Sequence, residues 1–179
     1  MTKLFHFSEN EGITVFKPRP VKAPSERPSG KDWLNGPLVW AIDDWHQPLY
    51  LFPRDCPRIL IWDTPSSNQE DRNKYFGSSK SRMLAYIEYG WQSALETSVI
   101  FRYELPTSSF ETIEDAGMWV SSKIVKPLDV TRIGNLPARI STADVELRVV
   151  SDLSRLRVAW DSTLHVSGIR LRNAKSWLE

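Results

Sequence analysis

Short apolar stretches alternate with polar, proline-containing segments along this chain. Runs rich in β-branched and aromatic residues predict strands, and they lie at residues 4–7, 13–16, 37–42, 58–62, 98–103, 118–120, 128–133, 145–150 and 166–171. Residues 45–51 follow two aspartates that can cap a helix, and Asp152 can cap another helix that runs to about Trp160. Residues 82–95 fit either a helix or a strand followed by a short helix.

The polar segments between these runs are long in two places. Residues 18–36 contain several prolines and basic side chains, and residues 63–81 are polar and rich in turn formers. We predict surface loops at 18–36 and 63–81; the first is interpreted as a solvated linker in preference to a basic flap over an anionic ligand. Many short strands with few helices indicate an α+β fold with mostly antiparallel, twisted sheets, and residues 1–179 are expected to form a single domain.

Composition narrows the possible partners. The net charge is +1, so no strong basic field favours nucleic acid. The chain has one cysteine, which fits a reducing compartment. No apolar run approaches the ~20 residues of a membrane helix, and the first residues lack a signal-peptide pattern. We therefore expect a cytoplasmic protein with no membrane or nucleic-acid partner; the composition does not determine its oligomeric state.

Ionisable groups are concentrated in one largely apolar stretch, residues 38–59. His6, between two phenylalanines, is interpreted either as a hydrogen-bonded core residue or as an acid–base group that completes a site built from this stretch. Ser8 and Glu9 can orient His6 or a ligand hydroxyl. His46 follows Asp43 and Asp44, but their spacing matches no known metal signature, so we predict ligand contact and no metal.

Two arginines in this stretch are bracketed by prolines. Pro53 and Pro57 restrict the backbone around Arg54 and Arg58. Rigid arginines suit a bidentate clamp on phosphate or carboxylate, but an internal ion pair, Arg54 with Asp55 or Arg58 with a carboxylate, is an equally weighted interpretation. Cys56 between them is interpreted as a small buried residue in preference to a nucleophile.

Several motifs resemble an uncharacterised family of small bacterial proteins of unknown function. They are His6-Phe7-Ser8-Glu9, Val39-Trp40-Ala41-Ile42-Asp43, Phe52-Pro53-Arg54-Asp55-Cys56-Pro57-Arg58 and, later, Trp119-Val120-Ser121 and Ser167-Gly168-Ile169-Arg170. The resemblance spans nearly the whole chain but implies no activity.

A first-strand histidine followed by a Val-Trp-Ala-Ile-Asp strand is also similar, more distantly, to the opening of the ADP-ribosyltransferase-like fold. This resemblance implies NAD as a substrate, His6 on the nicotinamide-side ribose or the adenosine of NAD, and Trp40 or Tyr50 stacked on nicotinamide. The pattern fails at the catalytic glutamate, because residues 117–122 contain none.

These observations leave three hypotheses. The first is an enzyme that binds NAD, a nucleotide-like molecule or another small anionic ligand, with transfer or hydrolysis of an ADP-ribosyl type. The second is a hydrolase, lyase or isomerase of a small metabolite that uses a His–Asp acid–base pair, and the third is a non-catalytic binding module. We expect His6, Asp55 and Glu9 to be catalytic. The expected ligand-binding residues are Ser8, Trp40, Asp43, His46, Tyr50, Arg54 and Arg58.

Overall fold

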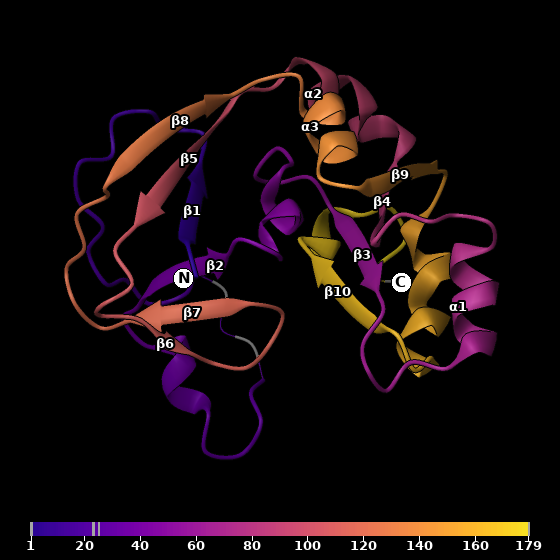
Figure 1. Ribbon diagram of the computed structural model, residues 1–179, viewed down its shortest axis with the longest axis horizontal. Coiled ribbons are helices and arrows are strands. Elements are labelled where there is room, and N and C mark those ends of the chain that lie inside the picture. Colours follow the sequence, from indigo (N-terminus) through magenta and orange to yellow (C-terminus); the bar gives the residue numbers. More distant parts are fainter. Residues whose placement is uncertain (1, 23, 25, 179) are drawn as a thin grey trace. The chain divides into compact units, whose positions relative to one another are not determined.

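The computed structural model describes residues 2–22, 24 and 26–178. It has an α+β fold with two mostly antiparallel sheets, as expected from the sequence (Figure 1). The strands are β1 Leu4–Ser8, β2 Val39–Asp43, β3 Arg58–Trp62, β4 Met83–Glu88, β5 Ile100–Leu105, β6 Glu111–Thr112, β7 Met118–Ser121, β8 Asp129–Ile133, β9 Val145–Val150 and β10 His165–Ile169. The α-helices are α1 Gln69–Phe76, α2 Gln92–Thr97 and α3 Leu136–Thr142, and the 3₁₀ helices are η1 Asp32–Asn35, η2 Gln47–Tyr50, η3 Tyr89–Trp91, η4 Leu153–Asp161 and η5 Leu171–Asn173.

The chain divides into two compact units. Unit 1 consists of Met1–Gln47 and Ile100–Ile133, and unit 2 consists of Pro48–Val99 and Gly134–Glu179. Each unit contains one of the two sheets. The expectation of a single domain stays a prediction, and each unit is described below by itself.

The sheet of unit 1 has the strand order β6-β7-β2-β1-β5-β8, and all of its neighbours are antiparallel. Leu4 pairs with Asp43, and Phe5 pairs with Ile42. Because side chains alternate along a strand, Leu4, His6 and Asp43 share one face of the sheet, whereas Phe5, Ile42 and Trp40 share the other. On the Trp40 face, Leu34, Leu38 and Val120 form a small buried cluster with Trp40 and Ile113 packed against it.

Residues 18–36 contain one short regular element in their described part, η1. The backbones of Arg19 and Leu38 exchange hydrogen bonds of 3.2 and 3.1 Å, which tie the segment to the start of β2. The prolines account for the rest of its irregular course, because they remove backbone donors and fix φ.

The sheet of unit 2 has the order β10-β3-β4-β9. Every residue of β3 and β4 is buried; the predicted strand at residues 58–62 is confirmed, and it lies in the interior of the sheet between β10 and β4. Strand β4 pairs with β9 in parallel, whereas its other neighbour β3 is antiparallel. Residues 82–95 resolve into β4, η3 and the short helix α2, which is the second of the two predicted alternatives.

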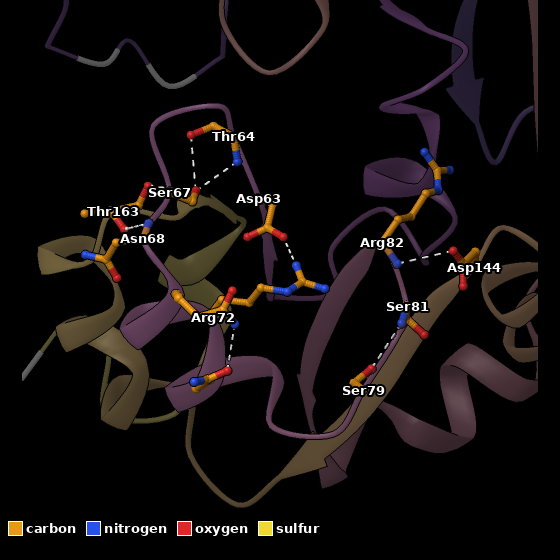
Figure 2. A network of polar contacts seen from close by, with 12 residues as sticks. Asp63, Thr64, Ser67, Asn68, Arg72, Ser79, Ser81, Arg82, Asp144 and Thr163 are labelled. Atoms are coloured by element: carbon orange, nitrogen blue, oxygen red, sulfur yellow. Dashed lines mark hydrogen bonds and ion pairs between the residues drawn. The ribbon is translucent and has the colours of Figure 1, made fainter.

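Residues 63–81 differ from the predicted loop, because helix α1 forms within them. The Asn68 side chain caps the helix by accepting from the backbone N–H of Asp71 at 2.8 Å. Asp71 in turn accepts from Thr163. Arg72 forms an ion pair with Asp63 (Figure 2). Helix α1 buries only Tyr75 and Phe76, so its apolar period is too short to be seen in the sequence, and capping and tertiary contacts stabilise it instead.

Helices elsewhere differ in length from the expectations. The two turns expected at 45–51 reduce to η2, because Pro48 cannot supply a helical N–H. Helix α3 was not predicted; it follows Asn135 in the left-handed region and has a proline in its first turn. The expected helix after Asp152 is η4, and Asp152 accepts from the Ser154 N–H at 2.8 Å. No helix in the described part of the chain is long and apolar enough to cross a membrane.

Candidate acid–base site

The ten predicted site residues fall in different units. Unit 1 contains His6, Ser8, Glu9, Trp40, Asp43 and His46, and unit 2 contains Tyr50, Arg54, Asp55 and Arg58. Of the predicted residues in unit 1, Asp43 and His46 contact each other through their side chains. In unit 2, Arg58 contacts the loop that precedes it.

The pair in unit 1 consists of Asp43, at the end of β2, and His46, in the turn that follows. Nδ1 of His46 lies 2.8 Å from Oδ1 and 3.0 Å from Oδ2 of Asp43. The backbone N–H of His46 also donates to Oδ1, at 2.8 Å. Both side chains keep 20% of their surface exposed, and the Trp45 ring lies edge-on to the imidazole at 4.5 Å. We refer to Asp43 and His46 as the dyad.

This geometry keeps Asp43 ionised and favours one tautomer of the His46 ring. Partial burial pushes the pKa of Asp43 upward, but the hydrogen bonds and the charge of His46 outweigh burial and hold that pKa below its usual value. Asp43 is therefore an anion near neutral pH. Its position favours the tautomer in which Nδ1–H of His46 donates to the carboxylate, so the lone pair of the neutral ring lies on Nε2.

Gly117, the last residue of the turn between β6 and β7, lies against the dyad. Its carbonyl accepts from the Asp43 N–H at 2.9 Å. A Cβ at Gly117 would lie 2.2 Å from Nδ1 of His46 and 2.7 Å from Oδ2 of Asp43, so no side chain fits there. The backbone of Gly117 has φ +68°, and Glu114 and Ala116 in the same β6–β7 turn also have positive φ, at 57° and 45°. Such conformations cost about 1–3 kcal/mol each at residues other than glycine and cluster at functional sites.

His6 lies on β1, on the same face of the sheet as Asp43. Its Nδ1 lies 2.8 Å from the Trp40 carbonyl oxygen, and its ring contacts Phe16 with the centroids 4.7 Å apart. Phe16 also packs edge-on against Tyr103, the partner of His6 across β1 and β5. The Trp40 side chain lies on the opposite face, where Arg27 stacks on its ring at 5.7 Å. His6 and Trp40 therefore do not line one face of this sheet together.

Ser8 and Glu9 lie at the turn after β1. Ser8 Oγ accepts from the Asn10 N–H at 3.0 Å, and Asn10 Oδ1 accepts from the Gly12 N–H at 2.9 Å. Glu9 is exposed. These contacts give Ser8 a role in the turn; the expected roles of Ser8 and Glu9 toward a ligand stay predictions.

In unit 2, Arg58 is buried, with 2% of its surface exposed. Its Nε donates to the Leu49 carbonyl at 2.8 Å, and its Nη1 donates to the Cys56 carbonyl at 2.9 Å. The Tyr50 and Phe52 rings lie 5.6 and 5.2 Å from the guanidinium carbon. Burial raises the pKa of Tyr50, partly offset by the nearby arginines.

Arg54 and Asp55 are exposed in the loop before Arg58. Their backbone carbonyls accept from Arg170 and Asn173, at 3.3 and 2.7 Å. The Asp55 carboxylate lies 3.8 Å from Nε of Arg170. These contacts attach the loop to the turn after β10.

Cys56 lies in the same loop and is fully buried. Burial raises the pKa of its thiol to about 12. The thiolate is therefore scarce at neutral pH, which supports the interpretation of Cys56 as an inert packing residue.

Sequence reasoning missed Gly117 as part of the site. The available signal was a glycine after Asp115 and Ala116 in a segment otherwise poor in glycine, but only the fold shows that the dyad lies against it. It also missed Arg102. Its Nη1 donates at 2.9 Å to Oε1 of Gln47, the residue that follows His46 in the sequence.

Within residues 2–22, 24 and 26–178, no group of three or more His, Cys, Asp or Glu side chains could hold a metal ion. No curated protein and no solved structure matches the chain, so the ADP-ribosyltransferase-like resemblance stays a prediction. A family model does match it, over residues 5–174. The chain belongs to that family, which is described as a family of unknown function (DUF6886).

Proposed function

We propose that this protein is an enzyme that performs acid–base chemistry on a small molecule, as a hydrolase, lyase or isomerase, with His46 as the general base. The observation that carries this proposal is the double contact of the His46 imidazole with the Asp43 carboxylate, at 2.8 and 3.0 Å. A carboxylate in this position orients the ring, selects its tautomer and stabilises the imidazolium that forms after proton transfer.

The proposed step begins with His46 as a neutral base. Nε2 accepts a proton from a water molecule or from a substrate group, and the positive charge that develops is shared with Asp43 through Nδ1–H. The same nitrogen then returns the proton to the leaving group or to another substrate atom. Partial exposure of both side chains is compatible with contact between the dyad and a small molecule.

The turn of β6 and β7 supports the proposal independently. Glu114 and Ala116 adopt left-handed conformations that favour glycine, and the result is the close approach of the Gly117 backbone to the dyad. A turn that only connects two strands does not require this close contact with an Asp–His pair.

Asp43 also accepts from the backbone N–H of His46, which is a structural role in the turn. Asp43→Asn separates the two roles. The asparagine Oδ1 can still accept from the backbone, whereas the negative charge that stabilises the imidazolium is lost. His46→Gln removes the base itself.

The test is turnover of a metabolite extract, followed by mass spectrometry, with NAD as a separate substrate because the resemblance implies it. The wild type is expected to consume a component, with His46→Gln and Asp43→Asn slower by about 10²-fold or more. His165→Gln is the control, because this histidine stacks on Trp62 at 4.1 Å in unit 2. Unchanged turnover in His46→Gln would overturn the assignment of the base, and binding without turnover would favour the non-catalytic module.

A further inference from the structure

We propose that unit 2 binds single-stranded nucleic acid on a surface formed by η4 and by the segment of residues 170–178. Both segments belong to unit 2, and the proposal does not depend on the dyad or on the proposed catalysis. We refer to this surface as the Arg–Trp surface. It consists of two aromatic and four basic side chains: Trp160, Trp177, Arg155, Arg157, Arg172 and Lys175.

The two segments share a short sequence pattern. Residues 155–157 and 170–172 both have the sequence Arg-Leu-Arg, and each is followed by a tryptophan, Trp160 and Trp177. Residues 153–178 contain five of the 23 Lys and Arg residues of the chain but only one of its 22 Asp and Glu residues. The net charge of +1 for the whole chain does not reveal this basic segment. Basic residues interleaved with aromatic ones are typical of nucleic-acid-binding surfaces.

The fold packs the leucine of each pattern inward and leaves basic side chains exposed. Leu156 and Leu171 pack against the buried cluster of unit 2, whereas Arg157 and Arg172 beside them are exposed. Because a 3₁₀ helix has three residues per turn, Arg157 and Trp160 lie on the same face of η4. Each segment is thus fixed to the core through its leucine and presents basic side chains to solvent.

Hydrogen bonds hold the two segments side by side. At the start of η4, the buried Glu88 carboxylate accepts from the backbone N–H of Leu153 at 3.1 Å, and it also accepts from that of Lys175, at 3.0 and 3.1 Å. Further along η4, Nη2 of Arg157 donates to the backbone carbonyl of Trp177. The basic residues of η4 and Lys175 therefore lie on neighbouring segments.

The two tryptophans form an ordered aromatic platform. The guanidinium carbon of Arg157 lies 4.8 Å from the centroid of the Trp177 ring, and the Trp177 and Trp160 centroids lie 6.0 Å apart. A Cβ at Gly168 would lie 3.0 Å from the Trp160 ring and 2.3 Å from the Leu171 side chain, so both side chains close over that glycine. Trp160 is nevertheless 44% exposed. A ring that its neighbours hold and that still reaches solvent can stack on an unpaired base at little cost in conformational entropy.

The four basic side chains of the Arg–Trp surface are available for phosphate groups. All four are exposed, and none of them forms an ion pair with a residue in the described part of the chain. Arg170 is not counted among them, because it contacts the loop that contains Asp55. Aromatic rings for unpaired bases, together with cations for the phosphates, are the combination that favours a single strand over a duplex.

The experiment measures fluorescence anisotropy of a labelled oligothymidylate of about 15 nucleotides during titration with the whole protein. Oligouridylate of the same length replaces it in a second titration, and binding of either single strand supports the proposal. A DNA duplex of the same length is the comparison. We expect the apparent Kd of a single strand to be at least about tenfold lower than that of the duplex. The affinity is expected to fall as the salt concentration rises, because phosphate contacts release counterions.

Trp160→Leu is the principal variant, because it removes the stacking ring and keeps an apolar side chain. Its apparent Kd for the single strand is expected to rise by about fivefold to 100-fold, the usual effect of losing one base–aromatic stack. Trp33→Leu is the matched control, because Trp33 is 52% exposed and belongs to unit 1. This control is expected to bind like the wild type.

Arg155→Gln tests the cations without a change to either tryptophan. It is expected to weaken binding and to reduce the slope of log Kd against log salt concentration by about 0.7, the value for one phosphate contact on a single strand. Arg139→Gln is its control, because Arg139 is exposed in α3 of the same unit and lies outside the Arg–Trp surface. Neither the affinity nor the slope is expected to change in Arg139→Gln.

Three results would overturn the proposal. One is the absence of binding at protein concentrations up to about 10⁻⁴ M. Another is equal affinity for the single strand, the duplex and polyglutamate, which would mean a surface for polyanions in general or for an acidic protein. The third is a Kd that changes in neither Trp160→Leu nor Arg155→Gln, or that changes equally in Trp160→Leu and Trp33→Leu. None of these results bears on the dyad, because the turnover experiment above uses variants of unit 1.

Discussion

Oδ1 of Asp43 lies 2.8 Å from the backbone nitrogen of His46 and 2.8 Å from Nδ1 of its ring. One carboxylate oxygen thus shapes the turn and orients the imidazole. The rigidity of this arrangement comes from β2, which ends at Asp43, and from Gly117, whose backbone lies against both side chains.

Gly117→Ala is expected to displace the dyad. The new Cβ would lie 2.2 Å from Nδ1 of His46, and the residue already has φ +68°. We expect a loss of unfolding free energy of about 2–4 kcal/mol, measured by urea denaturation. Gly30→Ala is the control, because Gly30 has φ +81° but nothing within 4 Å of its Cβ; its expected cost is the backbone penalty alone, about 1–2 kcal/mol. An equal loss of unfolding free energy in the two variants would show that Asp43 and His46 can move away from the new Cβ at little cost in free energy.

Asp43 is expected to make stability depend on acid pH. Its pKa is lower in the folded protein than its usual value of 3.8, so the unfolded chain binds the proton more readily. The stabilisation from Asp43 is therefore present above that value and is lost as pH falls through the lower pKa of the folded state. The unfolding free energies of wild type and Asp43→Asn should differ more at neutral pH than at about pH 3. A difference independent of pH would contradict the lowered pKa.

Cys56 is expected to resist thiol reagents in the native protein. With a pKa raised to about 12, roughly one thiol in 10⁴ is ionised at pH 8, against about a quarter of free cysteines. Burial also blocks access. The reaction with Ellman's reagent should be slow for the native protein and fast in denaturant. Rapid labelling of the folded protein would reopen the nucleophile interpretation.

Glu88→Gln is expected to loosen the segment around Lys175. The buried carboxylate uses both oxygens on backbone N–H groups, whereas a glutamine has one oxygen and an amide that cannot accept. We expect a loss of about 1–3 kcal/mol and faster hydrogen exchange at Leu153 and Lys175. The exposed Glu96→Gln in α2 should change neither quantity. Unchanged exchange at Lys175 would mean that other contacts hold this segment.

The sequence predicts the strands well where composition and alternation agree. The apolar run of β3 and the aromatic run of β1 are recognisable because tertiary structure and local preference favour the same state there. Helix α1 was missed, although Asn68 followed by Glu70 and Asp71 is a helix-start pattern, because only two of its residues are buried. Helix α3 was missed because it is only seven residues long, has a proline in its first turn and buries only Leu136 and Ile140.

The candidate site was predictable only in part. Asp43 and His46 are three residues apart, so their contact is local and could be anticipated from the sequence. The approach of Gly117 and the pairing of Ile169 beside Arg58 depend on the strand order, which no short motif encodes. The opposite orientation of His6 and Trp40 likewise depends on the register of β1 with β2.

The discontinuous course of the two units has a consequence for biosynthesis. Every strand of unit 1 has been synthesised once the ribosome passes Ile133, although unit 2 began at Pro48. The sheet of unit 2 is complete only after β9 and β10 have been synthesised, and until then its buried strands β3 and β4 lack their outer neighbours. Strand β3, complete at Trp62, gains its neighbour β10 only when His165–Ile169 have been made, so it is the strand that stays longest without one of its partners and is exposed to aggregation and to chaperones meanwhile.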